Sequence, residues 1–244
     1  MNPDEENLLA SDQAGDAEAA RELGELLAGR GEVDAAETAF RRAEERGDVL
    51  AIMKLGFLLE DHRQDLAGAE AAYRRADERG SVDGTGNLGR LLRERGDLEG
   101  AEAAFRRAVE MGSVRAAGEL ALVVLRRGEV TIDEVSYLVD IVCLAADTAL
   151  IGSDSQGFTA AMALDEMVAT CDPAALHEGF RRADERGSLF GARNLGWDLR
   201  EKGHFAGAAE AFRRAVDRGD EESWVALSET YAQWGDHGAA EAVA

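Results

Sequence analysis

The chain has 244 residues, 45% of them hydrophobic and only two of them proline, so it can bury a sizeable core and run in long helices. Its 49 acidic residues outnumber its 27 basic residues, which gives a net charge of -22. That charge repels nucleic-acid phosphates and anionic lipid surfaces, so the composition argues against nucleic acid or a membrane as the partner.

Residues 1–15 form an acidic N-terminal lead-in outside the repeat described next, where we expect either a frayed segment or an incomplete capping helix. This segment has neither the basic start nor the apolar core of a secretion signal, so we expect a cytoplasmic location. Lys54 and Lys202 are the only lysines among the 27 basic residues, a bias that resembles proteins from GC-rich bacterial genomes.

Two sequence markers recur along the chain with one period. The first is Leu followed by a small residue, at Leu23-Gly24, Leu55-Gly56, Leu88-Gly89, Leu120-Ala121, Leu195-Gly196 and Leu227-Ser228. The second is an aromatic residue followed by Arg-Arg-Ala, at Phe40–Ala43, Tyr73–Ala76, Phe105–Ala108, Phe180–Ala183 and Phe212–Ala215. The first marker is spaced by 32 or 33 residues except for one interval of 75, which indicates an internal repeat.

Each repeat is predicted to form two amphipathic helices, because its apolar residues recur at steps of three and four. Glycines such as Gly31 mark the turn inside a repeat, and glycines such as Gly47 end the second helix, where glycine adopts a left-handed conformation without a Cβ clash. We expect the small residue after the repeat leucine to let the two helices of a pair approach closely.

The pattern resembles the tetratricopeptide signature, and its Gly-Asp or Gly-Ser endings are more similar to the Sel1-like branch. The residues that carry the resemblance are Trp224, Leu227, Ser228 and Tyr231 for the first half of the signature, and Ala36, Phe40 and Ala43 for the second. The resemblance implies an all-α fold, a right-handed α-solenoid of about seven antiparallel helix pairs.

The repeats divide the chain into segments. We assign repeats 1–3 to residues 16–112, two divergent helix pairs to 113–187, and repeats 6 and 7, the last of them truncated, to 188–244. A separate domain in the 75-residue interval, or a flexible junction at 152–155, is the alternative. The apolar stretch from Leu138 to Ile151 carries Asp140 and Asp147 and is too short to span a bilayer, so we expect a buried helix.

No motif indicates catalysis, a metal or a cofactor. Gly84 to Gly89 spells G-x-G-x-x-G, but no predicted strand precedes it, so we interpret it as a chance match. The four histidines lack paired metal-ligand spacing, and Cys143 and Cys171 are interpreted as reduced structural thiols. We therefore expect no enzyme, with a carboxylate pair assembled across distant repeats as the remaining alternative.

The repeated arginine pairs are interpreted as solvated helix surface. In four of the pairs one arginine follows a glutamate by four residues, the order that favours a helical ion pair: Glu37 and Arg41, Glu70 and Arg74, Glu102 and Arg106, Glu210 and Arg214.

The resemblance also implies a binding surface. In tetratricopeptide proteins the residues that flank the Leu-Gly pair on the first helix line a peptide groove on the concave side. The matching positions here are Met53, Phe57, Asn87, Arg90, Arg93, Arg115, Leu122, Phe190, Arg193, Asn194, Trp197 and Arg200. These Arg, Asn and large apolar side chains fit an extended peptide, since they can hold a carboxylate, a backbone amide and an anchor side chain.

The sequence thus favours a non-catalytic adaptor or scaffold that binds another protein or a peptide through the concave groove. One alternative is a module whose acidic outer face holds a basic partner. Another is a regulatory or sensory region in which the divergent middle pairs contact a small molecule or form a homodimer.

Overall fold

The computed structural model describes residues 3–128, 130–151, 156–235 and 239, and within them it contains fourteen α-helices and no β-strand. The expectation of an all-α repeat fold is confirmed. The chain forms two compact units, Met1–Ser113 and Val114–Ala244. The junction expected at 152–155 lies outside the described residues.

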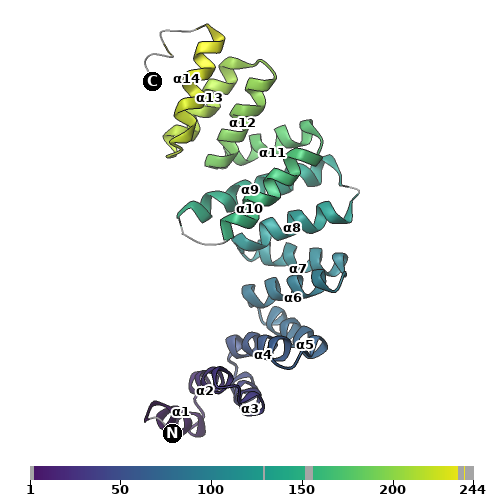
Figure 1. Cartoon of the computed structure of the whole chain (residues 1–244), viewed down its shortest axis with the longest axis vertical. Helices are drawn as coiled ribbons and strands as arrows, with labels where there is room; N and C mark the ends of the chain where they lie inside the picture. Colours follow the sequence, from purple (N-terminus) through teal and green to yellow (C-terminus); the bar gives the residue numbers. More distant parts are fainter. Residues whose placement is uncertain (1–2, 129, 152–155, 236–238, 240–244) are drawn as a thin grey trace. The chain divides into compact units, whose positions relative to one another are not determined.

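The first unit is a succession of helix pairs (Figure 1). Its helices are α1 (Pro3–Gln13), α2 (Ala17–Gly29), α3 (Val33–Glu45), α4 (Val49–Asp61), α5 (Leu66–Glu78), α6 (Val82–Glu94) and α7 (Leu98–Glu110). The pairs are α2 with α3, α4 with α5 and α6 with α7. Between pairs, α3 packs against α4 and α5 packs against α6. Helix α1 packs against α2 in the same way as α3 packs against α4.

The glycine of the Leu-Gly marker is the point of closest approach within a pair. A Cβ placed on Gly24, Gly56 or Gly89 would lie 2.6, 2.4 or 2.8 Å from a ring atom of the aromatic residue in the second marker. Any side chain at these positions would collide with that ring, because non-bonded carbon atoms prefer separations of about 3.5–4.0 Å. The two sequence markers are therefore the two sides of one contact.

Each second helix ends at a glycine with positive φ, such as Gly47 at 93°, which reverses the chain within one residue. The following residue caps the next helix: the Asp48 carboxylate accepts a hydrogen bond from the Ala51 amide at 3.0 Å. These local signals fix the start and end of neighbouring helices within the turn.

In the first unit, the second arginine of each Arg-Arg pair links its helix to the preceding second helix or to α1. Arg75 donates to Glu44 at 2.7 Å, and Arg107 donates to Asp77 at 2.6 Å. Each acceptor lies three residues before the glycine that ends its helix. Asp12 in α1 occupies the same position before Gly15 and accepts from Arg42 at 2.5 Å, so α1 takes the place of the second helix of an incomplete pair.

Three of the four expected ion pairs along a single helix are present. Arg41, Arg74 and Arg106 each lie within 2.6–2.8 Å of the glutamate four residues earlier. The fourth expectation is not met as stated, because Arg214 donates instead to Asp184 on the preceding second helix.

The second unit begins with four interleaved helices (Figure 1). The unit contains α8 (Val114–Arg127), α9 (Ile132–Ile151), α10 (Gln156–Thr170), α11 (Pro173–Glu185), α12 (Leu189–Glu201), α13 (Phe205–Asp217) and α14 (Glu222–Trp234). Helix α8 packs mainly against α10, and α9 mainly against α11, whereas α10 and α11 hardly touch. The two helix pairs expected in residues 113–187 are thus not two consecutive hairpins, because each helix packs mainly against the next helix but one.

Two glycines permit the interleaved packing. A Cβ on Gly118 of α8 would lie 2.8 Å from the backbone of Thr159 in α10, and a Cβ on Gly179 of α11 would lie 2.5 Å from Val139 in α9. The pairs α8/α10 and α9/α11 are thus each closed by a glycine. After them, α12 and α13 return to the regular arrangement, with Gly196 against Phe212.

Candidate partner-binding surface

The first helices of successive pairs form the surface on which the sequence places the binding residues. Each unit has its own surface of this kind, formed by α2, α4 and α6 in the first unit and by α12 and α14 in the second, and we call each of them the first-helix face.

In the first unit, the predicted residues differ in exposure. Met53 and Asn87 are buried, at 7% and 5% exposure, so they belong to the packed interior. Phe57 is half-buried, with its ring edge-on to Tyr73 at a centroid distance of 5.8 Å. Arg90 and Arg93 are also half-buried, and Arg90 is held in ion pairs.

In the second unit, Arg115 is exposed and Leu122 is half-buried, both on α8. Three further predicted residues lie together on α12. Arg193 covers the ring of Phe190 at 4.5 Å, and the Asn194 amide donates to the Phe190 carbonyl oxygen at 2.8 Å. Asn194 therefore bonds its own helix.

Arg193 also ties α12 to α14. Its guanidinium donates to Asp220 at 3.1 Å and to Glu222 at 2.7 Å. In the first unit Arg21 makes the equivalent contact with Asp48 at 3.0 Å. An arginine two residues before the repeat leucine, Arg21 or Arg193, thus helps to hold successive first helices together.

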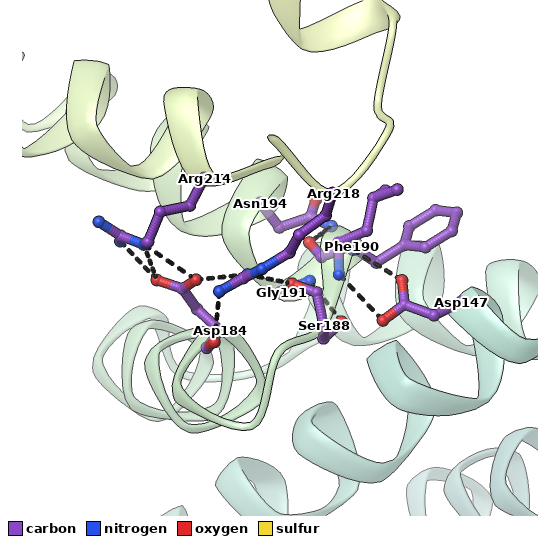
Figure 2. Close-up of polar contacts among 9 residues, drawn as sticks. Asp147, Asp184, Ser188, Phe190, Gly191, Asn194, Arg214 and Arg218 are labelled. Atoms are coloured by element: carbon purple, nitrogen blue, oxygen red, sulfur yellow. Dashed lines mark hydrogen bonds and ion pairs between the residues drawn. The ribbon is translucent and has the colours of Figure 1, made fainter. Parts of the chain in front are cut away.

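Two acidic residues lie near the turn before α12 and make several hydrogen bonds (Figure 2). Asp184, only 6% exposed, accepts from Arg214 at 2.5 Å and from Arg218 at 2.7 Å. Asp147 of α9 accepts from the backbone amides of Leu189 and Phe190, each at 2.9 Å. The first amides of α12, which would otherwise attract an anion, are therefore satisfied by the protein itself.

A pocket opens on the first-helix face between α2 and α4. Its volume is about 280 Å³, and its lining residues come from α2, α3, α4 and the residue that follows α4: Glu25, Ala28, Phe40, Lys54, Phe57, Leu58, Asp61 and His62. The floor is apolar, and the rim carries the charged groups. Of these residues, only Phe57 was predicted from the sequence.

The rim of this pocket, which we call the α2/α4 slot, has one unpaired carboxylate. Lys54 pairs with Glu25 at 3.3 Å, and Arg21 pairs with the same carboxylate at 3.3 Å. The Asp61 side chain makes no hydrogen bond or ion pair with any residue that the structure describes, and it is exposed.

The equivalent place between α4 and α6, the α4/α6 slot, is filled. Counting from the repeat leucines, Glu60 stands where Ala28 stands, and Arg90 and Glu94 stand where Phe57 and Asp61 stand. Arg90 donates to Glu60 at 2.6 Å and to Glu94 at 3.0 Å, and buried Tyr73 donates to Glu60 at 2.9 Å. A network of polar side chains occupies this slot.

Charges in the α4/α6 slot stabilise one another. The Arg90 guanidinium holds the pKa of Glu60 below its ordinary value, against the opposing effect of burial. Burial and the nearby Glu60 carboxylate raise the pKa of Tyr73. Glu60 therefore stays ionised and Tyr73 stays protonated near neutral pH.

The α12/α14 slot is filled as well. Arg200 stands where Ala28 stands, with Glu229 and Gln233 in the places of Phe57 and Asp61. Arg200 donates to Glu229 and to Gln233, both at 3.0 Å, and its guanidinium lies 5.0 Å from the centre of the Trp197 ring. Trp197 itself is 42% exposed beside this slot.

Sequence reasoning missed the α2/α4 slot because no single residue in it is unusual. The available signal was a comparison of repeats at one position, five residues after the repeat leucine. Ala28 stands there in the first repeat, where three other repeats carry the charged residues Glu60, Arg93 and Arg200.

No other chemistry is evident in the part of the chain that the structure describes. The G-x-G-x-x-G match from Gly84 to Gly89 lies wholly inside α6. Among the described residues, no group of three His, Cys, Asp or Glu side chains is arranged to hold a metal ion. In the same residues, no helix has both the length and the apolar character needed to cross a bilayer.

Comparisons with known proteins identify the family. The tetratricopeptide repeat model matches residues 6–50, 87–131 and 193–244, more than half of the chain. No curated protein matches the sequence. A solved Sel1 repeat protein from Oxalobacter formigenes has a similar fold, with a TM-score of 0.50 and 18% identity over 93% of this chain and 83% of that one.

Two other structures match more loosely. YrrB, described as a TPR protein with an unusual peptide-binding site, has a TM-score of 0.42 and 18% identity over 87% of this chain and 92% of that one. The complex of the TPR2AB domain of yeast Sti1 with pHSP90 has a TM-score of 0.40 and 12% identity over 93% and 87%. On the strength of the family model, this chain belongs to the tetratricopeptide repeat family.

Proposed function

We propose that this protein is a non-catalytic adaptor or scaffold that binds a partner protein or peptide on its first-helix face. Arrays of helical repeats present extended surfaces that commonly bind other proteins. The observation that carries the proposal here is the α2/α4 slot, an open pocket of about 280 Å³ on that face. A cavity of about 150 Å³ already accepts benzene, so this pocket has room for a large side chain of a partner.

Six of the predicted residues have three different roles under this proposal. Phe57 and Trp197 are accessible and supply apolar surface for a partner. Arg90, Arg193 and Arg200 are committed to ion pairs between first helices, so they set the shape of the face. Met53 supports it from the interior.

Photo-crosslinking tests the proposal directly. A photoreactive phenylalanine analogue replaces His62, an exposed residue that lines the α2/α4 slot, or Trp197 on the first-helix face. In matched controls it replaces Arg41 or Arg74, whose side chains are 58% and 57% exposed on second helices. These positions avoid Arg90 and Arg193, whose loss would disturb helix packing. We expect one partner from extracts of the native cell to be captured at the first two positions and not at the controls.

The Ala28→Arg variant should abolish capture at position 62, because arginine at the equivalent position fills the α12/α14 slot. Equal capture from the second-helix positions would refute the proposal and favour an outer-face interaction.

A further inference from the structure

The two filled slots share one occupant. In the α4/α6 slot the guanidinium of Arg90 lies between acceptors on two first helices, Glu60 and Glu94. In the α12/α14 slot the guanidinium of Arg200 lies between Glu229 and Gln233, both on α14. Arg90 comes from the later helix of its slot, α6, whereas Arg200 comes from the earlier helix of its slot, α12. Each arginine nevertheless bonds the residue six positions after the repeat leucine of the later helix, Glu94 in α6 or Gln233 in α14.

The α2/α4 slot contains the acceptor but not the arginine. Asp61 stands six positions after Leu55, in the place of Glu94 and Gln233, and it has no partner among the described residues. Neither Ala28 nor Phe57 can supply a guanidinium. Lys54, which lines the pocket, is paired with Glu25 instead.

The walls of this slot also suit a guanidinium with an aliphatic stem. Phe57 offers a half-buried ring, and Leu58 and Ala28 line the apolar part of the pocket. Guanidinium groups stack on aromatic rings and bind carboxylates with two parallel hydrogen bonds. The chain uses the same stacking where Arg200 lies over Trp197.

We infer that the α2/α4 slot binds an arginine side chain supplied by the partner, so that the partner completes the arrangement that the chain completes by itself in its other two slots. This inference rests on the proposed function. The carboxylates of Glu25 and Asp61 and the net charge of -22 disfavour an acidic partner at this place. The partner is therefore a peptide or protein segment with an exposed arginine.

A titration with blocked tripeptides tests the inference on the full chain. The probes are acetyl-Gly-X-Gly-amide, where X is arginine, lysine, citrulline or leucine; citrulline keeps the shape of arginine without its charge. Binding is followed by nuclear magnetic resonance at the Ala28 and Leu58 methyl groups and the His62 ring. We expect the arginine peptide to shift these signals at the lowest concentration and to bind about two- to fivefold more tightly than the citrulline peptide, the range of an exposed ion pair.

Three variants sharpen the test. Asp61→Asn should remove the preference for arginine over citrulline, whereas Asp83→Asn, which removes an exposed carboxylate of the same unit, should leave it unchanged. Ala28→Arg should abolish peptide binding, since its own guanidinium would take the place of the ligand. Equal binding of arginine and citrulline, or tightest binding of leucine, would overturn the inference.

Two further outcomes separate this inference from the proposed function. Capture of a partner on the first-helix face that Asp61→Asn does not weaken would leave the proposed function standing and overturn the arginine assignment. Sedimentation that shows self-association of the wild type, lost in Asp61→Asn, would mean that a second copy supplies the arginine and would overturn the assignment to a separate partner.

Discussion

Replacing Gly56 with alanine should destabilise the protein, although alanine is the better helix former. The new Cβ would lie 2.4, 2.7 and 2.9 Å from three ring atoms of Tyr73, which is fully buried and hydrogen-bonded to Glu60. The ring would have to move by roughly 1 Å to restore normal contact distances. Overpacking of this kind costs about 1–3 kcal/mol, and the gain in helix propensity offsets about 0.5–1 kcal/mol, so we expect a net loss of about 1–2 kcal/mol.

Urea unfolding followed by circular dichroism measures this loss. Gly29→Ala is the matched control: Gly29 lies in helix α2, and a Cβ added there would meet no neighbouring atom within 4 Å, so this substitution should leave stability unchanged or raise it slightly. If Gly56→Ala unfolded at the same urea concentration as the wild type, the explanation of the Leu-Gly marker as a close-contact site would be refuted.

Three other expectations concern charged and thiol groups. Asp184→Ala should lower the free energy of unfolding by about 2 kcal/mol, because two partly exposed arginines lose their acceptor; thermal unfolding measures it. Glu60 has a lowered pKa in the folded protein, so its contribution to stability is present above its unfolded pKa of about 4.5 and is lost as the pH falls through the folded value. The free energy of unfolding of Glu60→Gln should therefore fall less between neutral and acidic pH than that of the wild type. An equal fall in both proteins would contradict the role of Arg90. A thiol reagent should modify the half-buried Cys171 in the native protein but Cys143 only after unfolding, as a Cys171→Ser variant would show by its lack of rapid reaction.

The regular repeats could be predicted because their signals are local. Leu55-Gly56 and the Tyr73 marker lie within one repeat, and the glycines that end helices act on the next residue. The links between repeats were harder to predict, because Arg75 and its acceptor Glu44 are 31 residues apart. The recurrence of an acidic residue three positions before the terminal glycine was the sign that such links exist.

The packing of α8 to α11 could not be predicted from spacing. The period disappears over the 75-residue interval, and α9 is 20 residues long where most helices have 13. Gly118 and Gly179 mark the two crossings, but nothing in the sequence says which helix each glycine meets. The α2/α4 slot could not be predicted for a similar reason. It becomes visible only when Ala28 is compared with Glu60 and Arg200 at the same position of other repeats.

Because α8 to α11 are interleaved, the two units should differ in how they unfold locally. In the first unit each pair depends on its immediate neighbours, so fraying can start at one end and proceed pair by pair. In the second unit α8 packs mainly against α10, and α9, which lies between them in the sequence, packs mainly against α11. None of the four helices can therefore unfold alone. Amide hydrogens in α9 and α11 should therefore exchange together as one cooperative block, whereas those of α1 and α2 exchange earlier.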